Sequence, residues 1–294
     1  MESFEPFPLT SLPDPLIEHV LLFVGQEDLI NNCRKTCRLF RSIVDRNAFW
    51  KSKCLRENKV IPTFRPSELP PRYYQRIYIG NPYGRNLLRN VHGDSPKSPF
   101  HRWQILENGG DGWKREEAPN GADPLPLDNQ GCFATSYGAC SKQQVISLVS
   151  EGIPPEVLDN VRPDIEVSEW HAARFDCGCT YQLTVSLLNE KRKVVQQFAT
   201  GEIVTEQWVG RQWSQASVKH VFRDYPKGVR FVKFWHYGSD TQFWAGHYGA
   251  KMAGGSIRVS GHKEGAVLEP AKCTSTAGGH KQAAASRSAT RAHT

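Results

Sequence analysis

The stretch Tyr181-Gln-Leu-Thr-Val-Ser-Leu187 alternates apolar and polar side chains without a break. Asp164-Ile-Glu-Val-Ser-Glu-Trp170 and Val229-Arg-Phe-Val-Lys-Phe-Trp235 follow the same pattern. A period of two places the apolar side chains on one face of a strand, so each stretch predicts a β-strand that packs on a core. Further strands are predicted at residues 132–135, 142–149, 193–199, 215–222 and 255–260.

Turn-forming residues separate these predicted strands. Asn108-Gly-Gly-Asp-Gly112, Tyr225-Pro-Lys-Gly228 and Tyr237-Gly-Ser-Asp240 are read as turns because they are rich in Gly, Pro, Asn and Asp. Pro154-Pro-Glu-Val-Leu158 predicts a single helical turn. Many short strands without long helices between them favour an antiparallel β-sandwich.

The first folded block has a helical period instead. Asp14 is expected to cap the first helix, with Pro15 at its first position and Gly25 ending it. Apolar residues at helical spacing continue to about residue 57: Leu16, Ile17, Val20, Leu21, Val24, Leu29, Ile30, Cys33, Cys37, Phe40, Ile43, Val44, Phe49, Trp50 and Cys54. A block of about 45 residues is too small to bury all these faces, so a partner should cover one.

Two further segments complete the expected domain organisation. Residues 58–80 combine four prolines with Tyr73, Tyr74 and Tyr78, which predicts a packed connector. Residues 263–294 contain few large apolar side chains and are expected to be disordered. The expected domains are therefore a helical block at 9–57, a connector at 58–80, a sandwich at 81–262 and a tail at 263–294.

Charge and cysteine usage argue against several classes of protein. The net charge of +7 is spread along the chain rather than gathered in a stripe, which disfavours a nucleic-acid partner. The first residues lack the basic and apolar regions of a secretory signal, and residues 16–24 are too short to span a bilayer. The eight cysteines are therefore expected to be thiols in a reducing compartment, and the protein to be cytoplasmic.

The sequence contains no recognisable catalytic constellation. It has no Gly-x-Ser-x-Gly elbow, no His-Glu-x-x-His and no phosphate-binding loop. Cys33 and Cys37 are read as core thiols, and Cys177-Gly-Cys179 as a turn at a strand end. Nothing supports Cys140 as a nucleophile. We therefore expect a non-catalytic protein without a metal or other cofactor.

One loop has the composition of a shallow saccharide site. Tyr237-Gly-Ser-Asp-Thr-Gln-Phe-Trp-Ala-Gly-His-Tyr-Gly249 combines three aromatic rings with hydrogen-bonding side chains. Aromatic faces flanked by polar groups suit the C–H surfaces and hydroxyls of sugars. The alternative is that Trp244 and Tyr248 cap the sandwich core.

The order of several motifs resembles a known family. Leu12-Pro-Asp-Pro-Leu-Ile-Glu-His-Val-Leu21, followed by residues 32–45 and Phe49-Trp50-Lys51, is similar to an F-box. The downstream chain resembles the F-box-associated (FBA) domain of the sugar-recognising F-box only proteins. The matching stretches are residues 84–90, 108–113, 132–137, 162–167, 228–232 and 240–249.

The resemblance implies an α+β multidomain protein: a small all-α F-box followed by an antiparallel, jelly-roll-like β-sandwich. It implies a substrate-recognition subunit of an SCF (Skp–cullin–F-box) ubiquitin ligase that binds high-mannose glycoproteins for ER-associated degradation. The expected places are the cytoplasm and the cytosolic face of the endoplasmic reticulum. Docking on a Skp-type adaptor, and through it on cullin, would use Leu12, Pro13, Leu16, Ile17, Val20, Leu21, Leu29 and Trp50.

The same resemblance places glycan binding at Tyr137, Phe243, Trp244 and Ala245. Phe243 lacks the hydroxyl of the family's tyrosine, and Ala245 stands where the best-known binder has lysine. Ala253-Gly-Gly-Ser256 also departs from the family's Thr-Asn-Ser-Ser pattern. Two alternatives therefore remain: an SCF adaptor that recognises a protein surface without glycan, and a free lectin or scaffold.

Overall fold

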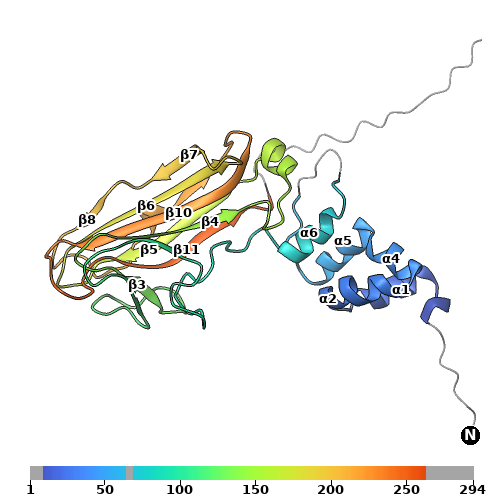
Figure 1. Cartoon of the computed structure of the whole chain (residues 1–294), viewed down its shortest axis with the longest axis horizontal. Coiled ribbons are helices and arrows are strands. Elements are labelled where there is room, and N and C mark those ends of the chain that lie inside the picture. The colour runs from blue at the N-terminus through green and yellow to red at the C-terminus, as the bar shows by residue number, and fades with distance from the viewer. Residues whose placement is uncertain (1–8, 64–68, 263–294) are drawn as a thin grey trace, which may run out of the picture. The chain divides into compact units, whose positions relative to one another are not determined.

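The computed structural model describes residues 9–63 and 69–262 (Figure 1). The predicted disordered tail at 263–294 lies outside these residues. The described residues of the helical block and the connector form eight helical segments, the last of them in the connector: η1 (Leu9–Ser11), α1 (Asp14–Leu21), α2 (Gln26–Asp28), η2 (Leu29–Cys33), α3 (Arg34–Thr36), α4 (Arg38–Val44), α5 (Asn47–Arg56) and α6 (Tyr73–Gly80).

The predicted cap of the first helix is wrong by one residue. Pro13 has an extended backbone and takes the capping position, whereas Asp14 is already helical. The amides of Leu16 and Ile17 donate to the Pro13 carbonyl at 2.9 and 3.2 Å, which fixes this start. Gly25 does not end α1, which stops at Leu21; it caps the start of α2 instead.

The interior of the helical block is held by apolar burial and one indole hydrogen bond. Ile17, Leu29 and Phe49 are fully buried. The Trp50 ring is buried as well, and its Nε1–H donates to the Val44 carbonyl at 2.7 Å. This bond satisfies the polar atom that burial would otherwise leave unpaired.

The sandwich consists of two antiparallel sheets. Its strands are β1 (Gln104–Asn108), β2 (Lys114–Glu116), β3 (Cys132–Ala134), β4 (Cys140–Ser147), β5 (Ile165–Ala172), β6 (Cys179–Asn189), β7 (Val194–Ala199), β8 (Ile203–Thr205), β9 (His220–Phe222), β10 (Val229–Asp240) and β11 (Lys251–Val259). One sheet has the order β1-β4-β10-β6-β7, with β8 also paired to β6. The other has the order β2-β3-β11-β5-β9. The predicted sandwich is thus confirmed.

Three details of the predicted strands are wrong. Tyr237-Gly-Ser-Asp240 is not a turn, because β10 continues through it and pairs Tyr237 with Gln182 and Asp240 with Cys179. The strand predicted at 215–222 is only β9, preceded by the 3-10 turn η4 (Ala216–Val218). Strands β1, β2 and β8 were not predicted at all. The helical turn predicted at Pro154–Leu158 is present and extends into η3 (Val157–Val161).

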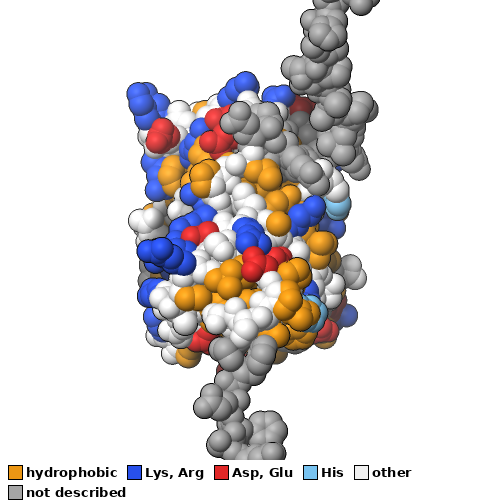
Figure 2. All heavy atoms as spheres, turned by 90° about the vertical axis from the view of Figure 1, so that its right-hand side faces the viewer, with side chains coloured by type: hydrophobic (Ala, Val, Ile, Leu, Met, Phe, Trp, Pro, Cys, Tyr) orange, Lys and Arg blue, Asp and Glu red, His pale blue; other side chains and the backbone are white. Residues whose placement is uncertain are grey.

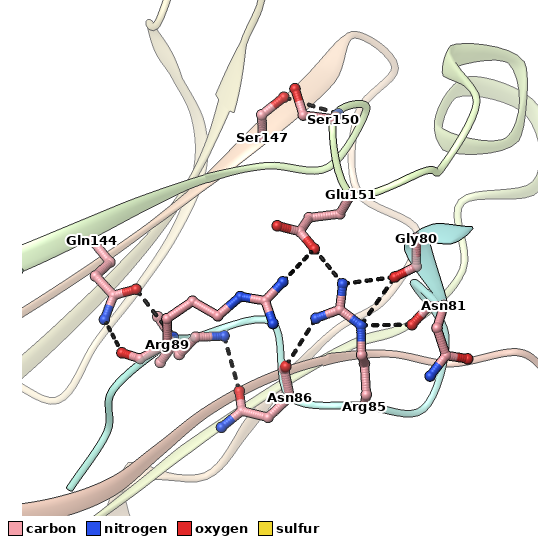
Figure 3. A network of polar contacts seen from close by, with 10 residues as sticks. Gly80, Asn81, Arg85, Asn86, Arg89, Gln144, Ser147, Ser150 and Glu151 are labelled. Atoms are coloured by element: carbon pink, nitrogen blue, oxygen red, sulfur yellow. Dashed lines mark hydrogen bonds and ion pairs between the residues drawn. The ribbon is translucent and has the colours of Figure 1, made fainter. Parts of the chain in front are cut away.

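The connector is packed, as its aromatic residues predict, but it also contains a helix. Tyr73, Tyr74 and Tyr78 of α6 are all buried. Beyond α6, the Arg85 guanidinium donates to the Gly80 carbonyl at 2.8 Å and to the carboxylate of Glu151 (Figure 3). Glu151 also accepts from Arg89 at 3.1 Å. One carboxylate in a sandwich loop therefore binds two arginines of the chain that leads into the sandwich.

Candidate functional site

The aromatic loop between β10 and β11 is fixed by hydrogen bonds to Asp240. This carboxylate is buried, and its Oδ1 accepts the amides of Gln242 and Phe243 at 3.0 and 2.6 Å. Burial raises the pKa of Asp240, while these backbone N–H donors oppose the shift. The two bonds fix the loop where Phe243 takes a left-handed backbone with φ of 57°. Bulky residues rarely adopt this conformation without such support.

A second set of bonds ties this loop to two neighbouring connections. Asp111 Oδ2, from the turn after β1, accepts the Gly246 amide at 2.6 Å. Ser136 Oγ accepts the Asp111 amide at 2.9 Å and donates to the Gly246 carbonyl at 2.7 Å. Three connections far apart in sequence are therefore joined at one end of the sandwich.

Tyr137 belongs to this assembly because it directly follows Ser136. A Cβ added to Gly110 would lie 3.1 Å from Tyr137 Cδ1 and 2.8 Å from Ser136 Oγ. Gly110 also has a positive φ of 63°, so glycine suits both the space and the backbone at this position. The Tyr137 ring thus lies against the turn that binds the aromatic loop.

Two of the three aromatic side chains of the loop are exposed to solvent. The exposed fraction is 79% for Phe243 and 39% for Trp244, and Ala245 is exposed too. Trp244 meets Tyr248 edge-on, with ring centroids 5.7 Å apart. Trp244 is exposed and Tyr248 is half-buried, so neither belongs to the fully buried core. Of the predicted glycan-binding residues, Phe243, Trp244 and Ala245 are adjacent and exposed, and Tyr137 is half-buried.

The structure divides the predicted adaptor-docking residues into two groups. Pro13, Leu16 and Val20 are exposed and Leu12 is half-buried, whereas the other four side chains form the helical interior: Ile17, Leu21, Leu29 and Trp50. The buried four can support docking only by holding α1 in place. Figure 2 looks onto the side of the molecule that lies to the right in Figure 1, and apolar side chains gather there between charged ones.

Sequence reasoning missed an exposed apolar pair beside α1. Phe23 and Leu55 are each 61% exposed, and the Arg56 guanidinium lies 3.4 Å from the Phe23 ring centroid. Neither residue belongs to the apolar stripe found in the sequence, and an apolar residue off that stripe gives no signal of its own for a binding surface. Asp111 and Ser136 were missed as loop supports because their bonds connect residues distant in sequence.

Buried titratable groups within the sandwich face no solvent and no cleft. His236 Nδ1 donates to Glu169 at 2.8 Å, and the Tyr181 hydroxyl donates to the same carboxylate at 2.7 Å. The Lys142 Nζ lies against His236 Nε2 and over the ring of Phe133, and burial lowers the pKa of this lysine well below its ordinary value. All these groups are almost fully buried, so a substrate has no access to them.

The Cys140 thiol is buried too, and burial raises its pKa, which disfavours the reactive thiolate.

Within residues 9–63 and 69–262, no group of three or more His, Cys, Asp or Glu side chains is arranged to hold a metal ion. In the same ranges, no helix has both the length and the apolar character needed to cross a membrane.

Comparisons with known proteins match both folded parts of the chain. An F-box-like family model matches residues 9–56, and a model of the F-box associated region matches residues 78–259. The chain is 39% identical to human F-box only protein 6 over 86% of this chain and 84% of that protein. It is 37% identical to mouse F-box only protein 27, over 85% of this chain and 90% of that protein.

Similarity to solved structures is much weaker. A family 22 carbohydrate-binding module of Clostridium thermocellum Xyn10B matches 61% of this chain and 96% of its own, with 8% identity and a TM-score of 0.36. A similarity at this level does not bear on what the chain binds. The family models and the relatives do establish its family: this chain belongs to the F-box only proteins with an F-box associated region.

Proposed function

We propose that this chain is the substrate-recognition subunit of an SCF ubiquitin ligase and binds N-glycosylated proteins with high-mannose glycans for ER-associated degradation. The F-box would dock on a Skp-type adaptor and, through it, on cullin. The loop end of the sandwich would bind the glycan. The protein itself would supply no catalytic residue for ubiquitin transfer.

The exposed apolar side chains of α1 support the docking half of this proposal. Leu16 is 52% exposed and Val20 is 42% exposed, although both belong to a helix with a well-packed opposite face. Full burial of an exposed side chain of this type contributes about 1.5–3 kcal/mol, and roughly half of that remains available at Leu16 and Val20 because each is already about half buried. A partner helix over this face would therefore gain a useful share of its binding free energy from these two residues.

The observation that carries the glycan half is the 79% exposed Phe243 on a backbone of positive φ, beside the exposed Trp244. An isolated loop would not hold Phe243 in a left-handed backbone conformation with its ring in water. Here Asp240 and Asp111 fix the loop through its amides. Such preorganised aromatic faces are suited to stacking on sugar rings. The missing Tyr hydroxyl at Phe243 would cost about 1 kcal/mol, which stacking could outweigh.

Titration calorimetry of the purified protein with a chitobiose-containing high-mannose glycan tests the proposal. Trp244→Ala should weaken binding by at least about tenfold, equivalent to about 1.4 kcal/mol. Phe23→Ala is the matched control, because it removes another exposed ring, but from the helical block. If folded wild-type protein captures substrate equally before and after enzymatic deglycosylation, recognition of a protein surface replaces glycan binding.

A further inference from the structure

A second exposed aromatic residue shares the unusual backbone of Phe243. Trp208 follows β8, has a φ of 70° and is 69% exposed. Among the described non-glycine residues of positive φ, Trp208 and Phe243 are the aromatic ones. Holding a large ring in the left-handed region has an energetic cost, and such strain is concentrated at functional sites. The fold thus presents two rings to solvent in the same way.

The loops that bear these two rings meet at Gly178. The Thr241 amide donates to the Gly178 carbonyl at 3.0 Å, which anchors the Phe243 loop. A Cβ at position 178 would lie 2.7 Å from the Thr205 carbonyl oxygen and 3.1 Å from the Gln207 amide nitrogen. The backbone of the Trp208 loop therefore packs directly on the same glycine. Gln207 Nε2 also donates to the Asp176 carbonyl at 2.9 Å, which fixes that loop to the β5–β6 connection.

Side chains of the β5–β6 connection link the two aromatic loops. The Trp208 and Phe175 ring centroids lie 6.3 Å apart. The Arg174 guanidinium lies 5.8 Å from the Phe175 centroid and 4.6 Å from that of Tyr248. Because Tyr248 contacts Trp244, the run of rings continues from Trp208 to the candidate glycan loop. Arg174 Nε is held by Asp176 at 2.6 Å, so the polar link between the rings is fixed.

We propose that Trp208 and Phe175 form a second saccharide platform, which binds outer hexose residues of the oligosaccharide whose inner sugars stack at Phe243 and Trp244. This inference rests on the proposed glycan binding and extends it. Fixed polar groups between aromatic faces suit hydroxyl-rich rings. An apolar peptide on the same surface would offer no hydrogen-bond acceptor to the part of the Arg174 guanidinium that is still exposed, whereas sugar hydroxyls would supply one.

The test compares three ligands: chitobiose, a complete high-mannose oligosaccharide released from its protein, and an unglycosylated, denatured polypeptide. Calorimetry is done with the full chain as wild type, Trp208→Ala and Val209→Ala. Val209 is the matched control, because it neighbours Trp208 and is 74% exposed. Trp208→Ala should weaken binding of the oligosaccharide by about tenfold and leave chitobiose binding unchanged. Val209→Ala should change neither affinity.

Equal oligosaccharide affinity for Trp208→Ala and wild type overturns the second platform. So does an effect of Trp208→Ala that is confined to binding of unglycosylated, denatured polypeptide, which would assign the surface to peptide. Trp244→Ala separates this inference from the proposed function. If it leaves chitobiose binding unchanged while Trp208→Ala weakens oligosaccharide binding, the first site is misplaced and the second platform stands. Wild-type protein that binds neither chitobiose nor the oligosaccharide overturns both.

Discussion

At the scale of single residues, His171 has an unusual environment inside the sandwich. Its ring lies flat against Tyr181, with centroids 4.4 Å apart. Burial lowers the pKa of His171 to about 4, and its Nε2 accepts no hydrogen bond from any residue that the structure describes. Burial likewise lowers the pKa of His236 to about 4. Both rings are therefore neutral in the folded protein at neutral pH.

This environment predicts a loss of stability in mild acid. Above the ordinary histidine pKa of about 6.5, His171 is neutral in both the folded and the unfolded chain, so its titration does not lower the stability of the fold. Between that pH and about 4, the unfolded chain takes up a proton that the folded chain does not, and stability falls. His171→Phe keeps the stacked ring and removes this acid-dependent loss, which amounts to up to about 3 kcal/mol of the free energy of unfolding.

Denaturant midpoints measured from pH 7 to pH 4 check this prediction. The His171→Phe curve should fall less steeply with acid than the wild-type curve. His262→Gln is the control, because His262 is exposed. Parallel curves for wild type and His171→Phe would show that the buried histidine does not govern the acid response.

Sequence alone could identify some residues of the candidate sites but not others. The exposed pair Phe243 and Trp244 was found because aromatic and polar residues are concentrated in one loop. Trp208 gave no such signal, because its role depends on contacts with Gly178 and Phe175 from another connection. Helical periodicity placed Leu16 and Ile17 on one stripe, but only packing shows that Ile17 is buried and Leu16 is exposed.

At the scale of elements, α1 is the helix whose outer face can be tested directly. Leu16→Asp with Val20→Asp should abolish co-precipitation of a Skp-type adaptor, because two charges would have to be desolvated against the partner. Thermal unfolding should change little, since both side chains are exposed. Val194→Asp, on an exposed valine of β7, should leave adaptor binding intact. Undiminished co-precipitation by the α1 variant would place docking elsewhere.

The strands that were predicted correctly are those in which apolar and polar side chains alternate over a long run, with the apolar ones buried. β6 and β10 were found because their apolar side chains alternate over many residues. β1 was missed since all its side chains are exposed, and β2 and β8 because three residues carry too little of a pattern. Gly238 suggested a turn, yet its pairing with Tyr181 on one side and Cys140 on the other keeps it in β10.

At the scale of the whole molecule, the helical block and the sandwich share one cluster of buried apolar side chains, which includes Trp50, Tyr78 and Val259. Sequence predicted a packed connector but not the ion pairs beyond it. Glu151 accepts from Arg85 and Arg89, and both Arg85 and Glu151 are largely shielded from solvent. Partners in this network lie far apart along the chain, so no local pattern could reveal them.

Glu151→Ala should lower the free energy of unfolding by about 1–3 kcal/mol, because it leaves the shielded Arg85 without its carboxylate partner. Glu151→Gln should lose less, since it keeps an oxygen acceptor. Glu117→Ala removes another arginine ion pair, but from a carboxylate that is 93% exposed, and should cost little. Chemical denaturation of the three variants measures the differences. Equal losses at 151 and 117 would refute a structural role for the network.

The unequal exposure of the tryptophans also gives the molecule an intrinsic optical property. Trp50, Trp103 and Trp113 are buried, whereas Trp208 and Trp244 are the exposed indoles among the eight, all of which lie in described residues. Exposed indoles emit at longer wavelengths and are open to collisional quenchers such as acrylamide. Trp208 and Trp244 therefore contribute to the red edge of the protein's own fluorescence, and their emission can report ligand occupancy at these loops without a label.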